Sequence, residues 1–303
     1  EIMPSLVGSE MCIRDSAHIE LERAYAQVGG NGQINMALCC DFLSWRLSLH
    51  TDVERRYTFS ERYAALLRYH DASWINIWSA TSAYYHALRG ETDKIPEIFS
   101  QHRLSDIHLL APGKPMMEMI ENQVYLAQGA YAKVVGRSAE LLAACEAMHY
   151  ALVALHIRIQ TAAAYARLGK PETAHTWLQK ALSDAGPDGL VMPFAENYSI
   201  LKPLLARETR SAFTARITAL GEAALARGAE RLRPAAFRAL TAREFEIVEL
   251  MAQRLSNREI AQKCYLSEGS VKQYVNQIYS KLHIEGDTRT KRAQLAALLH
   301  EKT

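Results

Sequence analysis

The sequence predicts an all-α protein with two parts, an array of helical repeats followed by a compact helix-turn-helix unit. Across residues 17–207, alanine and leucine are abundant and runs of β-branched residues are few, and no Asn-Gly or Asp-Gly hairpin signal separates alternating strands. Near the carboxyl end, patterns that cap helix starts recur at short spacing. The chain has 303 residues, 49% of them hydrophobic and 22% charged, which is long enough for two globular domains.

A short motif recurs through the first part of the chain. Tyr25, Tyr125 and Tyr165 are each followed four residues later by glycine, and Gly90 ends a looser copy. The last three of these glycines are 39 and 40 residues apart. Because glycine readily ends a helix, this spacing predicts pairs of helices stacked into a curved superhelix. The pattern is similar to tetratricopeptide repeats, although its period is longer than theirs.

Aromatic residues of this array are candidates for an inducer-binding groove. Trp74, Trp78 and Tyr85 could line such a groove, because aromatic faces bind sugars, cations and apolar effectors. The alternative is ordinary packing between helices, which is the commoner role of such residues. No metal site is expected, since no group of Cys, His or carboxylate residues has the spacing of metal ligands.

The array is expected to be bounded by segments of different character. Residues 1–16 have no helical period and resemble a translated sequencing-adapter fragment, so we expect a non-native, poorly ordered tail. Residues 208–235 are predicted to connect the two parts through a helix over about 208–227 and then a linker. The linker is expected from Gly228 to Pro234, because glycine ends helices and proline favours extended geometry before it. The last domain then covers residues 236–303.

Three helix starts are marked near the carboxyl end. Thr241 with Glu244 and Ser256 with Glu259 both match the capping box, in which side chain and backbone satisfy each other's unpaired N–H groups. Ser267 is the predicted N-cap of a third helix. Helix starts at this spacing require tight turns between the helices, which predicts a helix-turn-helix.

The third of these helices has two contrasting faces. One is an apolar stripe at helical spacing, formed by Val271, Val275, Ile278 and Leu282. The other presents Lys272, Gln273 and Asn276, with no acid among them. Lysine can donate to guanine, and Gln or Asn can pair with adenine, so this face suits the major groove of DNA. A merely solvated helix surface is the alternative.

Phosphate contacts are expected around the start of the same helix. The N–H groups at a helix N-terminus bind phosphate, and glycine there permits close approach of the backbone. The candidate phosphate-binding residues are Arg258, Ser267, Gly269, Ser270, Tyr274 and Lys281.

Residues 240–299 resemble the LuxR-type helix-turn-helix output domain. The family pattern is Leu-Thr-x-Arg-Glu, then Ser-Asn-Lys/Arg-Glu-Ile-Ala, then Ser-x-x-Thr/Ser-Val-Lys, and finally Lys-Leu. These motifs occur here in that order, beginning at Leu240, Ser256 and Ser267 and ending at Leu282. Three positions depart from the pattern: Cys264 replaces the usual Leu, Tyr274 the usual His, and Arg254 the usual Gly.

The resemblance implies a function and a set of partners. In this family the third helix enters the major groove and the fourth pairs two domains on a two-fold site. The fourth helix is expected here from about Thr288, with dimer contacts from Leu295, Leu298 and Leu299. The resemblance thus implies a transcriptional activator that binds double-stranded DNA as a homodimer or oligomer and works with RNA polymerase.

The combination of both parts resembles the large ATP-dependent regulators of the MalT-like class. In those proteins an NTPase module comes first, a helical superhelix senses an inducer or a regulatory protein, and the output domain comes last. No G-x-x-x-x-G-K-[ST] motif occurs in this chain. We therefore expect a carboxyl-terminal fragment that needs no cofactor, with ATP binding confined to a missing amino-terminal module.

Several function classes are disfavoured. No nucleophile–base pair, metal-ligand spacing or phosphate loop indicates an enzyme. Five cysteines without a Cys-x-x-Cys pair favour a reducing cytoplasm. No apolar run approaches the roughly 20 residues of a membrane-spanning helix, so no membrane association is expected. The competing hypothesis is a helical scaffold that binds another protein and does not bind DNA.

Overall fold

The computed structural model of the chain describes residues 18–28, 34–50, 72–107, 111–232, 235–237 and 239–300. Within these ranges every regular element is helical, which confirms the predicted all-α class. The chain forms two compact units, Glu1–Leu225 and Ala226–Thr303. The expected tail over residues 1–16 lies outside the described residues.

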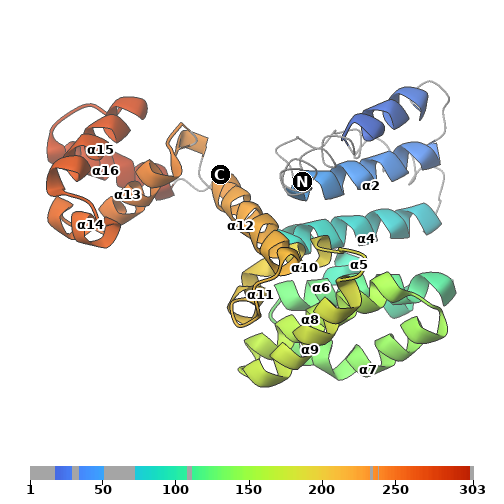
Figure 1. The fold of residues 1–303 in the computed structure, drawn as a ribbon. Helices are drawn as coiled ribbons and strands as arrows, with labels where there is room; N and C mark the ends of the chain where they lie inside the picture. Colours follow the sequence, from blue (N-terminus) through green and yellow to red (C-terminus); the bar gives the residue numbers. More distant parts are fainter. Residues whose placement is uncertain are drawn as a thin grey trace, which may run out of the picture. The chain divides into compact units, whose positions relative to one another are not determined.

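The first unit is a stack of helices in which neighbours along the chain pack on one another (Figure 1). Helices α4, α6 and α8 also form a continuous layer, with α4 against α6 and α6 against α8. Its helices are residues 18–28, α2 (Ile34–His50), α4 (Ala72–Leu88), α5 (Glu97–Ser100), α6 (Lys114–Ala127), α7 (Tyr131–Ala147), α8 (Ala151–Arg167), α9 (Pro171–Ala185), α10 (Met192–Glu196), α11 (Tyr198–Leu205) and the larger part of α12 (Ala212–Leu232). Short 3₁₀ turns η1 (Thr92–Lys94), η2 (Leu104–Asp106) and η3 (Ala111–Gly113) connect α4 to α6.

The repeated glycines end the helices of this layer, as the sequence indicates. Gly90, Gly129 and Gly169 follow α4, α6 and α8 and adopt φ angles of +70°, +77° and +71°. These left-handed angles favour glycine because it has no Cβ atom. After each glycine the next N–H donates back to the helix, as from Ala130 to the carbonyl of Tyr125 at 2.8 Å. The glycine of each repeat therefore marks where a helix of the layer ends.

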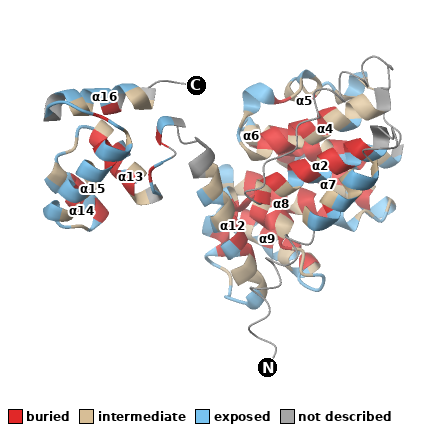
Figure 2. Ribbon diagram, turned by 90° about the horizontal axis from the view of Figure 1, so that it is seen from above, coloured by how far each residue is buried: buried red, intermediate tan, exposed pale blue. Residues whose placement is uncertain are grey.

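Helix α8 is the centre of the first unit, because it packs against α6, α7, α9, α10 and α11 and contributes to two apolar clusters (Figure 2). Ile157 packs with Phe99 and Val124, on the side of α4 and α6. Ile159 packs in the larger cluster, which includes residues of α9, α10, α11 and α12. Because α8 packs on both sides, it has no exposed stripe over most of its length, and even its polar residues His156 and Gln160 are buried.

A buried ionic cluster connects α2 and α4 to α10. The Glu196 carboxylate, with a side chain only 1% exposed, lies 3.1 Å from the guanidinium of Arg46 and 3.5 Å from Nε2 of His50. The Tyr84 hydroxyl donates a 2.6 Å hydrogen bond to the same carboxylate. Burial alone would raise the pKa of Glu196, but the hydrogen bond from His50 and the charge of Arg46 lower it to about 2. Three helices distant in sequence thus share one carboxylate.

The second unit contains the end of α12 and four further helices around their own core. The elements are η4 (Ala235–Phe237), α13 (Ala242–Ala252), α14 (Asn257–Cys264), α15 (Glu268–Lys281) and α16 (Thr288–His300). Phe237, Ile247, Ile260, Val271 and Ile278 are fully buried in that core (Figure 2).

The expected boundaries of the connecting helix are wrong at both ends. The helix begins at Ala212 because the hydroxyl of Ser211 accepts the N–H of Thr214 at 3.1 Å, which caps the first turn. It continues through Gly228 to Leu232, so the linker expected from Gly228 to Pro234 is helical over most of its length. A glycine costs only about 1 kcal/mol inside a helix, and the Ala, Arg, Glu and Leu residues around it favour helix.

The predicted caps of the second unit are present. Thr241 and Ser256 each accept an N–H from the glutamate three residues on, while that glutamate accepts the N–H of the cap. Ser267 caps α15 by accepting the N–H of Ser270 at 3.0 Å. Glu244 does more than cap, because Nζ of Lys281 lies 2.8 Å from its carboxylate and so ties α13 to the end of α15.

The Glu196 cluster predicts a pH-dependent stability. The pKa of Glu196 falls from 4.5 to about 2 on folding, so its contribution is fully present above pH 5 and is lost as the pH falls toward 2. Glu196→Gln is expected to reduce the free energy of unfolding by about 3 kcal/mol at pH 7 and by much less at pH 3. Urea unfolding of both proteins at the two pH values measures this. Glu172→Gln, at an exposed ion pair, is the control, and an equal loss from Glu196→Gln at both pH values would contradict the assignment.

The two capping boxes offer a matched comparison. Glu259→Ala removes an exposed glutamate that accepts the N–H of the Ser256 cap, so only a small loss of stability is expected. Glu244→Ala removes a buried cap and leaves Lys281 without its carboxylate, so the expected cost is about 2–3 kcal/mol. Hydrogen exchange of the α13 and α15 amides in the full chain measures both losses. Equal losses would show that the Lys281 contact contributes nothing.

Candidate functional site

Helix α15 is held by one face against α13 and α14. Val271 and Ile278 are fully buried, in contact with the cluster that includes Ile247 and Ile260, as the apolar stripe predicts. The stripe is wider than expected, because Tyr279 is also buried. The rotation of α15 about its axis is therefore set by its own apolar residues.

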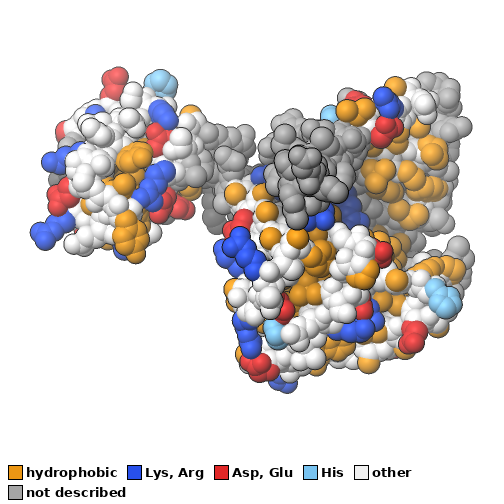
Figure 3. Space-filling view, in the orientation of Figure 1, with side chains coloured by type: hydrophobic (Ala, Val, Ile, Leu, Met, Phe, Trp, Pro, Cys, Tyr) orange, Lys and Arg blue, Asp and Glu red, His pale blue; other side chains and the backbone are white. Residues whose placement is uncertain are grey.

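The opposite face of α15 is open to solvent. Lys272, Gln273 and Asn276 are all exposed, and Ser280 continues the same face one turn further on. None of these four side chains is acidic, but Glu268, exposed in the first turn of α15, precedes Lys272 by four residues and so borders the same face. Figure 3 shows Lys and Arg side chains on the visible surface of this unit interspersed with acids, in accord with the formal net charge of +2 for the whole chain. Any anion would therefore be attracted by placement of the cations rather than by total charge.

The start of α15 is compact and partly self-satisfied. The Ser267 and Ser270 hydroxyls lie 2.9 Å apart, and Gly269 between them is exposed. Glu268, also in the first turn, is exposed. The backbone N–H groups of this turn point outward from the helix end, an arrangement that suits an anion.

The other expected phosphate contacts occupy different environments. Arg258 is exposed on α14 and makes no ion pair among the described residues. Tyr274 is half-buried and packs against the core of the unit. Lys281 is exposed, yet its ammonium already binds Glu244. Burial would raise the pKa of Glu244, but the hydrogen bonds from Lys281 and Thr241 hold it below its ordinary value, so the pair is ionic.

Two turns of the motif carry bulky residues in a left-handed conformation. Arg254, at the position usually occupied by glycine, has a φ of +63°, and Tyr265 has a φ of +55°. In both turns the next N–H bonds back to the preceding helix, from Leu255 at 3.3 Å and from Leu266 at 2.9 Å. The side chain of Tyr265 is 96% exposed, two residues before Ser267. Tyr265 was not among the predicted site residues, because its exposure depends on the geometry of this turn.

Part of the dimer surface expected on α16 is buried within its own unit. Leu295 is only 1% exposed and belongs to the core of its own unit, so it is not available to a second copy. Leu298 and Leu299 are partly buried and pack against the same core. The exposed residues of α16 include Ala293, Gln294 and Ala297, and a partner would have to contact these. The periodicity located the apolar edge correctly but did not indicate what covers it.

Two of the expected inducer-binding aromatics, Trp78 and Tyr85, belong to one packed cluster of the first unit rather than to an open groove. Tyr85 is buried and packs at 4.7 Å, between ring centroids, on Trp45 of α2. Trp78 packs against this pair, and Trp74 is half-buried at the start of α4. Tyr85 also lines a cavity between α2, α4, α6 and α8, to which Trp74 and Trp78 do not contribute. The cavity residues of α2, including Phe42 and Arg46, were not predicted as site residues.

Other classes of site are not found in the part of the chain that the structure describes. No cluster of three or more His, Cys, Asp or Glu side chains there could hold a metal ion. None of the described helices is both long and apolar enough to span a bilayer.

The family match to known proteins lies in the second unit. A family model described as "Bacterial regulatory proteins, luxR family" matches residues 238–293. The transcriptional regulatory protein LnrK of Bacillus subtilis (strain 168) is 44% identical over 50 residues, which cover 16% of this chain and 23% of that protein. The match thus spans about a quarter of the relative's length, and no solved structure matches the chain. With its capped helices and its one-sided α15, the carboxyl-terminal unit is a LuxR-type helix-turn-helix domain.

Proposed function

We propose that this chain is a sequence-specific DNA-binding transcriptional regulator in which α15 enters the major groove. The observation that carries this proposal is the exposure of Lys272, Gln273 and Asn276, which include no acid and are fixed outward by the burial of Val271 and Ile278. Lys can donate to the O6 and N7 atoms of guanine, and Gln and Asn can each donate to and accept from adenine. The three residues would therefore discriminate between base pairs.

Phosphate contacts would supply most of the affinity and set the register of α15 on the duplex. Arg258, and Gly269 in the N-terminal turn of α15, are exposed and therefore accessible to phosphate groups. The proposed set is the one expected from the sequence: Arg258, Ser267, Gly269, Ser270, Tyr274 and Lys281.

The remaining features of the proposed regulator follow from the order of its two parts. The first unit would sense an inducer or a regulatory protein, as superhelical arrays offer concave binding surfaces. The chain would act as an activator with RNA polymerase, as a homodimer or oligomer on DNA, in the cytoplasm. It would do so without enzymatic activity, as the sensor and output parts of a MalT-like regulator. Support comes from the helical array followed by the LuxR-type domain.

Asn276→Ala tests the base-reading role. After a preferred site has been selected from random DNA with the full chain, the substitution is expected to weaken binding to that site by about 1–3 kcal/mol. Binding to unrelated DNA should hardly change, because phosphate contacts dominate there. Fluorescence anisotropy at several salt concentrations measures both affinities.

The control for this experiment is Glu249→Gln, on the exposed face of α13. It is expected to leave the ratio of specific to unrelated binding unchanged. Equal losses on both DNAs from Asn276→Ala would contradict base reading by this residue. No sequence preference at any salt concentration would favour the scaffold hypothesis instead.

Ala297→Glu tests pairing through α16. Ala297 is exposed, so the change should not disturb the core, but two copies facing each other on a two-fold axis would bring two carboxylates together. We expect about tenfold weaker binding to DNA with two half-sites and unchanged binding to one half-site. Unchanged binding to both DNAs would show that α16 does not pair the domains through this face.

A further inference from the structure

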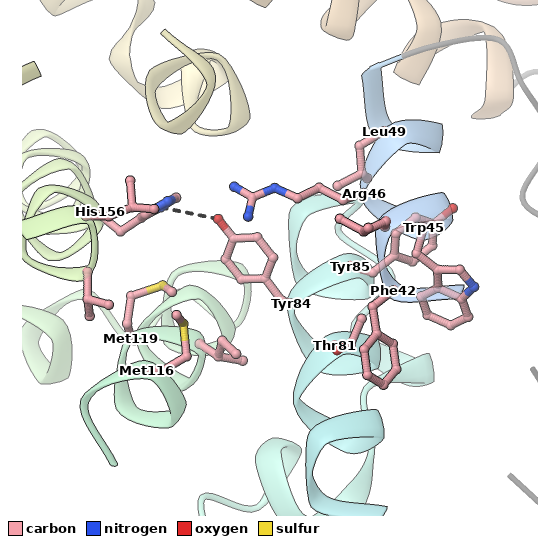
Figure 4. Close-up of a pocket in the computed structure, with 14 residues that line it drawn as sticks. Phe42, Trp45, Arg46, Leu49, Thr81, Tyr84, Tyr85, Met116, Met119 and His156 are labelled. Carbon is pink, nitrogen blue, oxygen red and sulfur yellow. Dashed lines mark hydrogen bonds between the residues drawn. The ribbon is translucent and has the colours of Figure 1, made fainter. Parts of the chain in front are cut away.

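The first unit contains a cavity that neither its stacking nor the DNA-binding unit requires. It has a volume of about 240 Å³ and lies between α2, α4, α6 and α8. Its lining includes Phe42 and Arg46 of α2, Tyr84 of α4, Met119 of α6 and His156 of α8 (Figure 4). Four helices that together span more than 100 residues of sequence thus contribute to one space.

The opening of the cavity is apolar and exposed. Leu43, Met116 and Leu152 all line it, yet they are 57%, 42% and 49% exposed. They come from three different helices, α2, α6 and α8, and so form a rim rather than a stripe along one helix. The free energy of the system falls when an apolar molecule displaces water from exposed apolar side chains around a hollow. The rim therefore favours an occupant that is largely apolar.

One end of the cavity is polar. Figure 4 shows the Arg46 side chain extending from α2 toward the hydroxyl of Tyr84, with His156 beyond it. The Tyr84 hydroxyl donates to Glu196, and Nδ1 of His156 lies 3.4 Å from that hydroxyl. Burial lowers the pKa of His156, which keeps the imidazole neutral at pH 7.

Arg46 is the donor that remains for an occupant. A guanidinium has five N–H groups, and the hydrogen bond to Glu196 at 3.1 Å occupies one of them. Its side chain is 49% exposed, whereas the Glu196 side chain is 1% exposed and faces the protein interior. At the polar end of the cavity, the N–H donors of the Arg46 guanidinium are thus accessible to an occupant, whereas the Glu196 carboxylate is buried and is not.

We propose that this cavity binds a small, predominantly apolar molecule that carries one hydrogen-bond-accepting group, with that group directed at Arg46. The volume is slightly below the range of roughly 300–1,000 Å³ that is usual for ligand pockets, so one ring with a short chain fills it. A cationic head group is disfavoured, because it would lie beside the guanidinium while the nearby Glu196 carboxylate is buried and already paired with Arg46. Binding at the cavity is independent of the proposed DNA function, and only a regulatory effect of binding rests on it.

Three probes that share a phenyl ring on a four-carbon chain test the head group. Isothermal titration of the full chain with 4-phenylbutanamide, 4-phenylbutanoate and 4-phenylbutylamine compares a neutral acceptor, an anion and a cation on one apolar body. We expect the amide and the carboxylate to bind, and the amine to bind at least about tenfold more weakly. Tighter binding by the carboxylate would identify an anionic ligand class, and tighter binding by the amide a neutral one. Equal affinity of all three would overturn the role of Arg46.

Two tryptophan substitutions test the location. Leu152→Trp places a bulky ring at the exposed rim and is expected to weaken binding of the better probe at least about tenfold by filling the opening. Leu168→Trp is the matched control, because Leu168 is 40% exposed at the end of the same helix but does not line the cavity. Unchanged affinity in folded Leu152→Trp protein, verified by circular dichroism, would overturn the site.

Arg46→Met provides a second test of the polar end. It should bring the affinities for amide and amine within about threefold of each other. Because this variant leaves Glu196 without its partner, Leu152→Trp remains decisive if the protein unfolds. DNA binding is measured separately in the same preparations. Loss of DNA preference with retained probe binding would refute the DNA function alone, and the converse would refute the cavity alone.

Discussion

The burial of Val271 and Ile278 against α13 and α14 is the constraint on which the DNA-reading surface depends. Side chains one residue apart on a helix diverge by about 100°, so fixing one stripe inward fixes Lys272 and Asn276 outward. Rotation of α15 would bury an unpaired ammonium and expose two β-branched residues, and both changes are unfavourable. The contact between Glu244 and Lys281 holds the other end of the helix in the same register.

The parts of the fold that could be predicted are those with local causes. A capping box involves residues three apart, so Thr241 and Ser256 identified their helix starts without any tertiary information. The same holds for the glycines after α4, α6 and α8, whose left-handed φ angles end those helices. The prediction was wrong where two local signals competed. Gly228 indicated an end, but the helix-forming residues around it prevailed, and the helix runs to Leu232.

The parts that could not be predicted are assembled from distant segments. Arg46, Tyr84, His156 and Glu196 meet at one place, yet Arg46 and Glu196 are 150 positions apart and no spacing rule connects them. Aromatic content drew attention to α4, whereas the cavity also depends on α2 and α6. Leu295 illustrates the same limit at the level of one helix. Its apolar character predicts burial, but whether its own core or a second copy covers it is a tertiary property.

The carboxylate of Glu196 joins the stability of the first unit to the proposed ligand. An acceptor bound at Arg46 would share a guanidinium that already holds α2 to α10, so binding and the arrangement of these helices are linked. Helix α10 leads directly into α11, where Tyr198 packs so closely on α12 that a Cβ atom at Gly221 would lie 2.1 Å from its ring. Helix α12 in turn contains the division between the two units, after Leu225. The contacts from Arg46 through Glu196 and Tyr198 therefore reach the part of α12 that belongs to the first unit.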